Sequence, residues 1–448
     1  MLILVSPIVI LLATLCMQWV ELGTFGAFSI KLPYATLALV VALTFVSGTK
    51  IRNSFSIFRK NAYWIVPFVL YLILMGLVQA GTPAANSAPR QALYLVGAIA
   101  LAGSLASTRR LSRTLRFGAA AGLVLLIVAI ELLARRIGLS WWDAVTRFLE
   151  GDFKFVVYSF FREIFRSVGS QGDLMGASTK NEVAVGVLVL GLLIRSASHT
   201  PARDIAGMVC MGVALGLLLL LNTRSVLIAA GFSLVLAIVL GASVRPRGSL
   251  FPLLLKGAAA LALIVIAANA SLPADGVSGE LGDRFAFDDQ STAARLEQYS
   301  AALDQIQRHP FVGSGYFEFE GHTIHNLFLS AWVQGGLAAF LFAVLFYGGL
   351  LFAWLSFLRM IVTRPHQWVL PIAPEWIAPL PIMPLFRMWS SGDGGLMFLG
   401  EWVAIGCFIG CCLVNQLRQR TLAQYLSRQR AAAPSMPSAG FAHPAAQR

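Results

Sequence analysis

The chain has 448 residues, of which 57% are hydrophobic and only 12% are charged. A soluble domain carries about 25% charged residues, so this composition excludes an ordinary soluble protein and indicates a membrane protein. The net charge of +13 does not indicate nucleic-acid binding, because the basic residues lie in short loops between apolar stretches, where they orient membrane proteins.

Stretches long enough to cross a bilayer, about 17–25 apolar residues, recur along the whole chain. They lie at 2–20, 32–48, 62–80, 91–107, 117–134, 181–195, 205–222, 226–243, 251–270, 332–358 and 396–416. The first has no basic residue before it, so we interpret it as a retained span and not as a signal peptide. The segment 366–390 is also apolar but contains five prolines; it makes the count twelve spans if it crosses and eleven if it does not.

Charge placement favours twelve spans. With the N-terminus in the cytoplasm, every second loop is short and basic, as cytoplasmic loops are. The tail 417–448, which is rich in arginine, then also lies in the cytoplasm. The expected fold is therefore an all-α polytopic bundle over residues 1–416, and the Ala/Pro/Ser-rich end of the tail is expected to be disordered.

Two long segments lie outside by this topology, at about 136–180 and 271–331. The first is rich in aromatic residues and places Arg162 and Arg166 four residues apart, on one helical face. We interpret it as a helix in the headgroup layer of the membrane.

The second outer segment carries the most varied chemistry. From Asp289 to His309 it predicts a helix whose apolar stripe is Leu296, Tyr299, Leu303 and Ile306, with Arg295 off that stripe. Pro310 ends this helix, and Gly313-Ser314-Gly315 predicts a tight turn. The chain then returns to the membrane through His322, His325 and Asn326. This places His325 near the mouth of the next span; the alternative is that His325 only caps the helix start.

Two further cationic positions fall on the same outer face. Arg224 lies in a connection of four residues, 222–225, between two spans, and Lys180 and Asn181 open another span. An arginine there can bind lipid headgroups, and a charged span end is often only solvated. The other interpretation is that the guanidinium of Arg224 holds a diphosphate. The expected topology places four residues at the same outer surface of the membrane: Lys180, Arg224, Arg295 and His325. This shared position favours binding of a diphosphate over four separate structural explanations.

The order of these motifs resembles the O-antigen ligase and polymerase superfamily, with real motif content over roughly 170–360. The motifs that carry the resemblance are, in chain order, Asn181, Thr223-Arg224-Ser225, Arg295, His309-Pro310, Gly313-x-Gly315, His325-Asn326 and Gly335-Gly336. The resemblance implies a metal-independent, inverting glycosyltransferase of the bacterial inner membrane that needs no cofactor. The donor would be an oligosaccharide or polysaccharide on undecaprenyl diphosphate, used on the periplasmic face among membrane lipids. The acceptor would be lipid A-core for a ligase, or a second lipid-linked glycan for a polymerase.

The resemblance also implies roles for individual residues. Arg224 and Arg295 would hold the diphosphate, whose developing charge two guanidinium groups can stabilise. His325 would take the proton from the acceptor hydroxyl. Apart from the resemblance, we expect Lys180, Asn181, Asn326, Arg162 and Arg166 on the outer face to contribute to substrate binding. His322 would do so as well, and because it lies so close to His325 the choice of base between the two stays open.

A transporter or flippase of lipid-linked glycan is the competing class. Transporters place polar groups near the middle of the bilayer on broken helices, often in repeated units. Here the ionisable residues gather at one face and no repeat is evident. No Walker A, HExxH or CxxC motif is present in the sequence.

Overall fold

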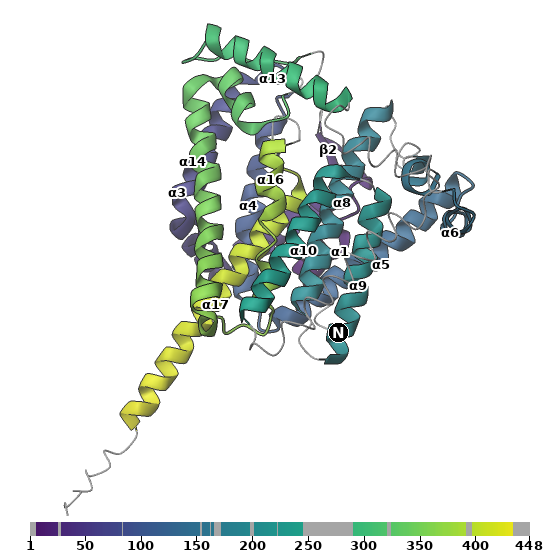
Figure 1. Ribbon diagram of the computed structural model, residues 1–448. Coiled ribbons are helices and arrows are strands. Elements are labelled where there is room, and N and C mark those ends of the chain that lie inside the picture. The colour runs from purple at the N-terminus through teal and green to yellow at the C-terminus, as the bar shows by residue number, and fades with distance from the viewer. Residues whose placement is uncertain are drawn as a thin grey trace, which may run out of the picture.

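The computed structural model describes residues 6–25, 28–82, 84–152, 155–161, 163–164, 172–197, 201–221, 223–244, 290–319, 324–390 and 397–432. The described residues form a helical bundle, accompanied by one short β-hairpin (Figure 1). The expected span 251–270, much of the second outer segment, Arg162, Arg166, His322 and the end of the tail lie outside these residues.

Helices dominate the described chain. The long helices are α2 (Leu32–Phe45), α3 (Gly48–Val78), α4 (Ser87–Ala106), α5 (Leu111–Arg136), α8 (Gly172–Ser196), α9 (Pro201–Leu221), α10 (Arg224–Val244), α13 (Gln290–Arg308), α14 (Leu327–Thr363) and α17 (Leu399–Ala432). The short ones are α1 (Pro7–Thr14), α6 (Trp141–Leu149), the π-helix η1 (Phe155–Phe160), the 3-10 helix η3 (Pro365–Gln367), α15 (Pro374–Ile377) and α16 (Ile382–Ser390). The strands β1 (Glu21–Phe25) and β2 (Phe28–Lys31) pair antiparallel.

The chain is an integral membrane protein of the all-α class. Five helical segments among the described residues are long and apolar enough to cross a bilayer. They are Gly48–Val78, Leu111–Arg136, Ser225–Ala242, Leu327–Thr363 and Leu399–Gln429. Leu32–Phe45 and Ile205–Leu221 are shorter apolar helices. These helices confirm the expected class, while the number of crossings stays a prediction.

Several boundaries differ from those read from hydropathy. Helix α3 begins at Gly48, so its basic residues Lys50 to Lys60 lie in a helix instead of a loop. Helix α8 begins at Gly172 and α17 continues to Ala432. Hydropathy marks only the apolar part of a helix, and Lys, Arg and Gln are good helix formers that extend it into the polar layer.

The proline-rich segment 366–390 is not one helix. It divides into η3, α15 and α16, and a proline starts both η3 and α15, as expected of a residue suited to the first turn of a helix. The backbone amide of Ala373 donates to the carbonyl of Ser196 (2.8 Å), and the Trp354 indole donates to the carbonyl of Ala378 (2.7 Å). These bonds hold the broken segment between α8 and α14.

The centre of the bundle is built around α17. Trp402 is fully buried, and its ring lies 5.2 Å from that of Phe68, which in turn lies 4.3 Å from the ring of Phe346. These contacts join α17, α3 and α14. Gly406 allows the backbone of α17 to approach α4 closely, since a Cβ there would lie 2.8 Å from the carbonyl oxygen of Ala98.

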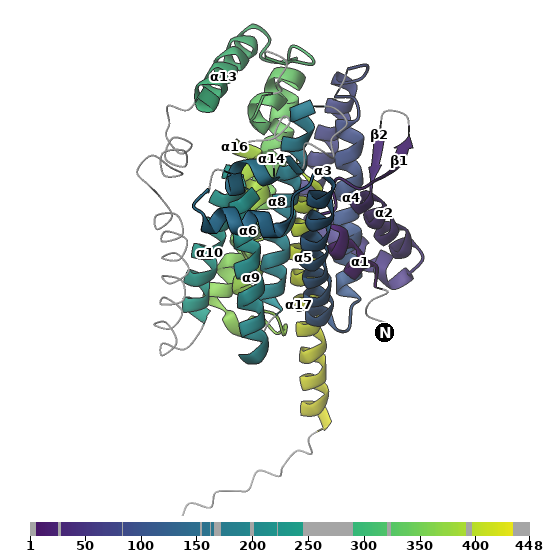
Figure 2. The same cartoon turned by 90° about the vertical axis from the view of Figure 1, so that its right-hand side faces the viewer.

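The two ends of the bundle differ. Helix α13 lies across one end, and the last part of α17 projects from the other (Figures 1 and 2). We call these the α13 end and the α17 end. The β-hairpin lies toward the α13 end (Figures 1 and 2), where β2 leads into α2 through Lys31.

Candidate functional site

Helix α14 is sharply bent at Gly336, whose backbone angles (φ 67°, ψ −163°) are not helical. The rings of Phe328 and Tyr347 are 5.3 Å apart, and those of Trp332 and Phe340 are 4.5 Å apart. In a straight helix Phe328 and Tyr347 would be about 28 Å apart. The segment Leu327–Gly335 therefore folds toward the long segment that follows it, and does not simply extend it as the sequence suggested.

The turn after α13 packs into this bend. The amides of Ser314 and Gly315 donate to the carbonyls of Val333 (2.7 Å) and Gln334 (3.2 Å). In return, the amide of Leu337 donates to the carbonyl of Phe311 (3.2 Å). The Gly-Ser-Gly turn and the Gly-Gly pair are thus two halves of one contact, which fixes α13 against the first segment of α14.

Asn326 caps the first segment of α14. Its Oδ1 accepts hydrogen bonds from the amides of Phe328 (2.9 Å) and Leu329 (3.1 Å), and its Nδ2 donates to the carbonyl of Trp389 in α16 (3.2 Å). The side chain is buried and uses both of its ends. The cap at this helix start is therefore Asn326 and not His325, which leaves the imidazole of the half-buried His325 outside the capping role.

Helix α13 reaches His325 through Tyr299. The Tyr299 hydroxyl donates to the backbone carbonyl of His325 (3.2 Å). Burial raises the pKa of Tyr299, and the charge of Arg295, one helical turn earlier, opposes that rise. The hydroxyl consequently stays protonated as a donor at neutral pH. Tyr299, one helical turn after Arg295, thus ties α13 to the backbone of His325.

The buried face of α13 differs from the expected stripe. Ala302 and Ile306 pack with Val333 in the first segment of α14, and Gln298 is buried, whereas Leu296 and Leu303 are 64% and 49% exposed. The small side chain of Ala302 permits the close approach that a leucine would block. The predicted stripe was therefore wrong at two of its four positions.

Arg224 and Lys180 are placed by three successive helices. Helices α8, α9 and α10 are joined by the short links 197–200 and 222–223, so α10 begins at the end of the bundle where α8 begins. Arg224 is the first residue of α10, as the expected tight connection requires. Lys180 and Asn181 lie in α8, about two turns after its start, so this helix begins before the apolar stretch that they were expected to open. Both are half-buried.

A buried ion pair that the sequence reading did not single out lies next to this region. The Nε of Arg387 in α16 is 3.4 Å from Oε1 of Glu401 in α17, and the two side chains are only 3% and 0% exposed. The Arg387 guanidinium also lies over the ring of Phe398, 3.6 Å from its centroid. Trp389, two residues further along α16, is the residue bonded to Asn326. The available signal was a lone arginine in a proline-rich apolar segment.

A second charged pair joins the residue before α2 to the third turn of α8. Lys31 Nζ is 3.3 Å from Oε2 of Glu182, which follows Asn181 in α8. Burial lowers the pKa of Lys31, but the nearby Glu182 carboxylate and Tyr34 outweigh burial, so the net pKa is raised. Arg90 of α4 is also close enough to act on Lys31. The two ion pairs lie on neighbouring helices, since α8, which contains Glu182, packs against α17, which contains Glu401.

The comparisons with known proteins give a family match over the middle of the chain. A sequence model described as O-antigen ligase matches residues 206–344, a range that includes Arg224, Arg295 and His325. No curated protein matches the chain. The match over the bent helix, the Gly-Ser-Gly turn and the residues beside them confirms the chain's resemblance to the O-antigen ligase and polymerase superfamily.

Proposed function

We propose that the protein transfers a glycan from a polyprenyl-diphosphate carrier, undecaprenyl diphosphate in bacteria, to an acceptor hydroxyl at the α13 end of the bundle. This end would face the periplasm. The acceptor is lipid A-core if the protein is a ligase, or a second lipid-linked glycan if it is a polymerase. The observation that carries the proposal is the hydrogen bond from Tyr299 of α13, the helix of Arg295, to the backbone of His325, inside the segment matched by the O-antigen ligase family.

The proposed reaction needs two kinds of group: cations that stabilise the leaving group and a base that accepts a proton. The leaving group is a lipid diphosphate, so Arg295 and Arg224 would stabilise the negative charge that develops on it. The imidazole of His325 would accept the proton of the attacking hydroxyl. The acceptor oxygen then bonds to the anomeric carbon as the bond to the diphosphate breaks, which inverts that carbon. No metal enters this scheme.

The hydrogen bonds of the backbone around His325 support this assignment. Asn326 fixes the following helix start, and Tyr299 holds the carbonyl of His325 itself. A general base acts efficiently only when its position is defined before the substrate arrives. The charged pairs Arg387–Glu401 and Lys31–Glu182 would contribute to the field around the substrate without touching the reacting atoms.

The test is transfer from purified undecaprenyl-diphosphate-linked glycan to acceptor by the purified full-length protein. Arg295→Ala should abolish transfer, and Arg295→Lys should restore it poorly, because lysine lacks the bidentate fork. Arg308→Ala is the matched control, since Arg308 is an exposed arginine at the far end of the same helix. It should transfer at the rate of the unmodified protein.

Two results would overturn the proposal. Full activity of Arg295→Ala would remove the cation that the mechanism requires. Loss of wild-type transfer on addition of EDTA would show that a metal carries out part of the chemistry. The products also separate the two acceptors, since a ligase attaches glycan to lipid A-core and a polymerase lengthens the chain on the carrier.

A further inference from the structure

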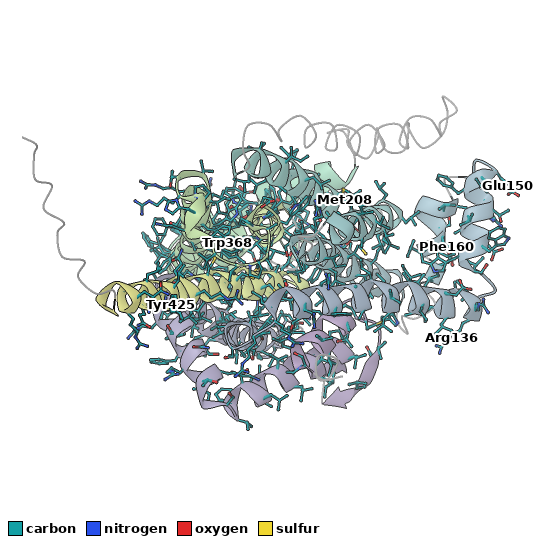
Figure 3. All side chains as sticks on the ribbon, turned by 90° about the horizontal axis from the view of Figure 1, so that it is seen from below. Arg136, Glu150, Phe160, Met208, Trp368 and Tyr425 are labelled. Atoms are coloured by element: carbon teal, nitrogen blue, oxygen red, sulfur yellow. The ribbon has the colours of Figure 1, made fainter. Side chains whose placement is uncertain are left out.

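A separate cavity opens at the α17 end of the bundle, away from the site described above. It has a volume of about 430 Å³, within the range of roughly 300–1,000 Å³ found for small-molecule sites. Its walls come from α3, α14 and α17, which are candidate membrane spans. Figure 3 looks onto this end and labels Trp368, one of the lining residues, beside α17.

The cavity is amphipathic. Its apolar part includes Ile57, Phe352, Phe357, Phe408 and Leu413, so it matches a hydrocarbon chain. Its polar part includes Lys60, Asn61, Gln367, Asn415, Gln416 and Gln419. The two kinds of lining residue come from the same three helices and the link after α14.

The polar part is organised by hydrogen bonds. Asn415 accepts from the amide of Val369 (2.8 Å) and donates to the carbonyl of Gln367 (2.9 Å), a carbonyl that also accepts from Gln419. Lys60 Nζ donates to Oε1 of Gln416 (2.5 Å). An ammonium group has three donors, so Lys60 can bind a ligand while it keeps this bond.

The charge around the cavity is positive. Arg59 and Arg420 are close enough to Lys60 to act on it electrostatically. Among the described residues that line the cavity, none is acidic. Helices α3 and α14 contain no acidic residue, and the single one in α17, Glu401, is at the opposite end of that helix.

We propose that this cavity binds an anionic phospholipid, with its acyl chain against the aromatic wall and its phosphate at Lys60, Arg59 and Arg420. Basic pockets between transmembrane helices are suited to anionic headgroups, and each nearby cation contributes to binding. A soluble anion would use the cations alone and leave the apolar wall exposed. The amphipathic lining therefore indicates a lipid.

The experiment measures lipid binding by the purified full-length protein with native mass spectrometry and thermal unfolding, without glycan substrates. Phosphatidylglycerol is compared with zwitterionic phosphatidylethanolamine and with sn-glycerol 3-phosphate, which has the phosphate but no chain. Phosphatidylglycerol should bind and raise the melting temperature, and the other two should not. The effect should weaken at high salt, as expected for charges near the surface.

Variants locate the site. Lys60→Gln/Arg420→Gln should weaken phosphatidylglycerol binding by roughly 25-fold, because each cation near an anionic headgroup contributes about fivefold. The matched control is Arg109→Gln/Arg428→Gln, which removes two exposed charges outside the cavity. It should bind as the unmodified protein does.

Equal stabilisation of the wild-type protein by phosphatidylethanolamine, or by glycerol phosphate alone, would overturn the proposal even if a variant failed to fold. Equal loss of binding in both double variants would assign the effect to general surface charge, which also overturns it. Since no step of this test involves transfer, its failure would leave the proposed function unaffected.

Discussion

Gly313 and Gly336 lie backbone against backbone, with no room for a side chain on either residue. A Cβ on Gly313 would lie 2.5 Å from the amide nitrogen of Gly336, and a Cβ on Gly336 would collide with the carbonyl of Phe311. Both residues also have positive φ, which other residues adopt at a cost. This contact between α13 and α14 sets where Arg295 and His325 lie.

Gly313→Ala and Gly336→Ala should each destabilise the protein by about 1–3 kcal/mol and lower transfer, because the turn can no longer enter the bend. Gly348→Ala is the control, since that glycine is in the same helix and has open space where a Cβ would lie. Thermal unfolding in detergent and the transfer assay measure both effects. Unchanged unfolding of Gly336→Ala would mean that the bend does not depend on this contact.

His325→Ala should lower turnover by about 10²–10⁴, the usual contribution of a general base. His322→Ala should cost much less, because the motif has the histidine directly before Asn326. Donor binding should survive in His325→Ala, since the cations and lipid contacts carry it. If His322→Ala were inactive while His325→Ala stayed active, His322 and not His325 would be the general base.

Asn326→Ala should destabilise the protein by about 0.5–2 kcal/mol through loss of the cap. Asn326→Asp keeps the accepting oxygen for Phe328 and Leu329 and loses only the donor to Trp389, so its melting temperature should fall less. Thermal unfolding of the two variants gives the comparison. Equal losses would show that the bond to Trp389, and not the cap, is the more important one.

Arg387→Met should destabilise the protein by about 3–5 kcal/mol, because it leaves the buried Glu401 without its partner. Arg387→Met with Glu401→Gln should be less harmful than the sum of the two single changes. The comparison pair is Arg147–Asp152, which is about half exposed; Arg147→Met should cost less than about 1 kcal/mol. Additive effects in the Arg387–Glu401 cycle would mean that the two charges do not interact.

The topology predicts that the N-terminus, the loop near Arg113 and the tail after Arg418 are cytoplasmic and that residue 300 is periplasmic. The motivation is the alternation of basic loops along the sequence. Cysteine labelling at these four positions measures it. If the tail were labelled from the periplasm, the prediction of twelve spans would be wrong.

Hydropathy was sufficient to predict the class of fold and many of the helices, because long apolar stretches have few alternatives in a membrane. It also located the tight connection before Arg224. It could not divide 366–390 into α15 and α16, since that outcome depends on bonds to Ser196 and Trp354 that lie far away in sequence.

The site was only partly predictable for a related reason. Its motifs are local in sequence, so Arg295, His325 and the glycines could be recognised. The pairing of Arg387 with Glu401 joins two consecutive helices, α16 and α17, and no local pattern encodes it. The roles of Gly313 and Gly336 could not be read from the sequence. Each must be a glycine because the backbone of the other lies where its side chain would be, and only the structure shows that contact.

The bend in α14 also determines how the chain is matched to the thickness of a bilayer. From Leu327 to Thr363 the helix has 37 residues, about 55 Å if it were straight, against a hydrocarbon core of about 30 Å. Because the apolar sequence is longer than the hydrocarbon core, hydrophobicity alone does not define where the membrane crossing begins. The bend at Gly336, which the Gly-Ser-Gly turn contacts, divides these residues into a short segment, Leu327–Gly335, and a long one, Leu337–Thr363. The long segment is about 40 Å in length, much closer to the thickness of the hydrocarbon core.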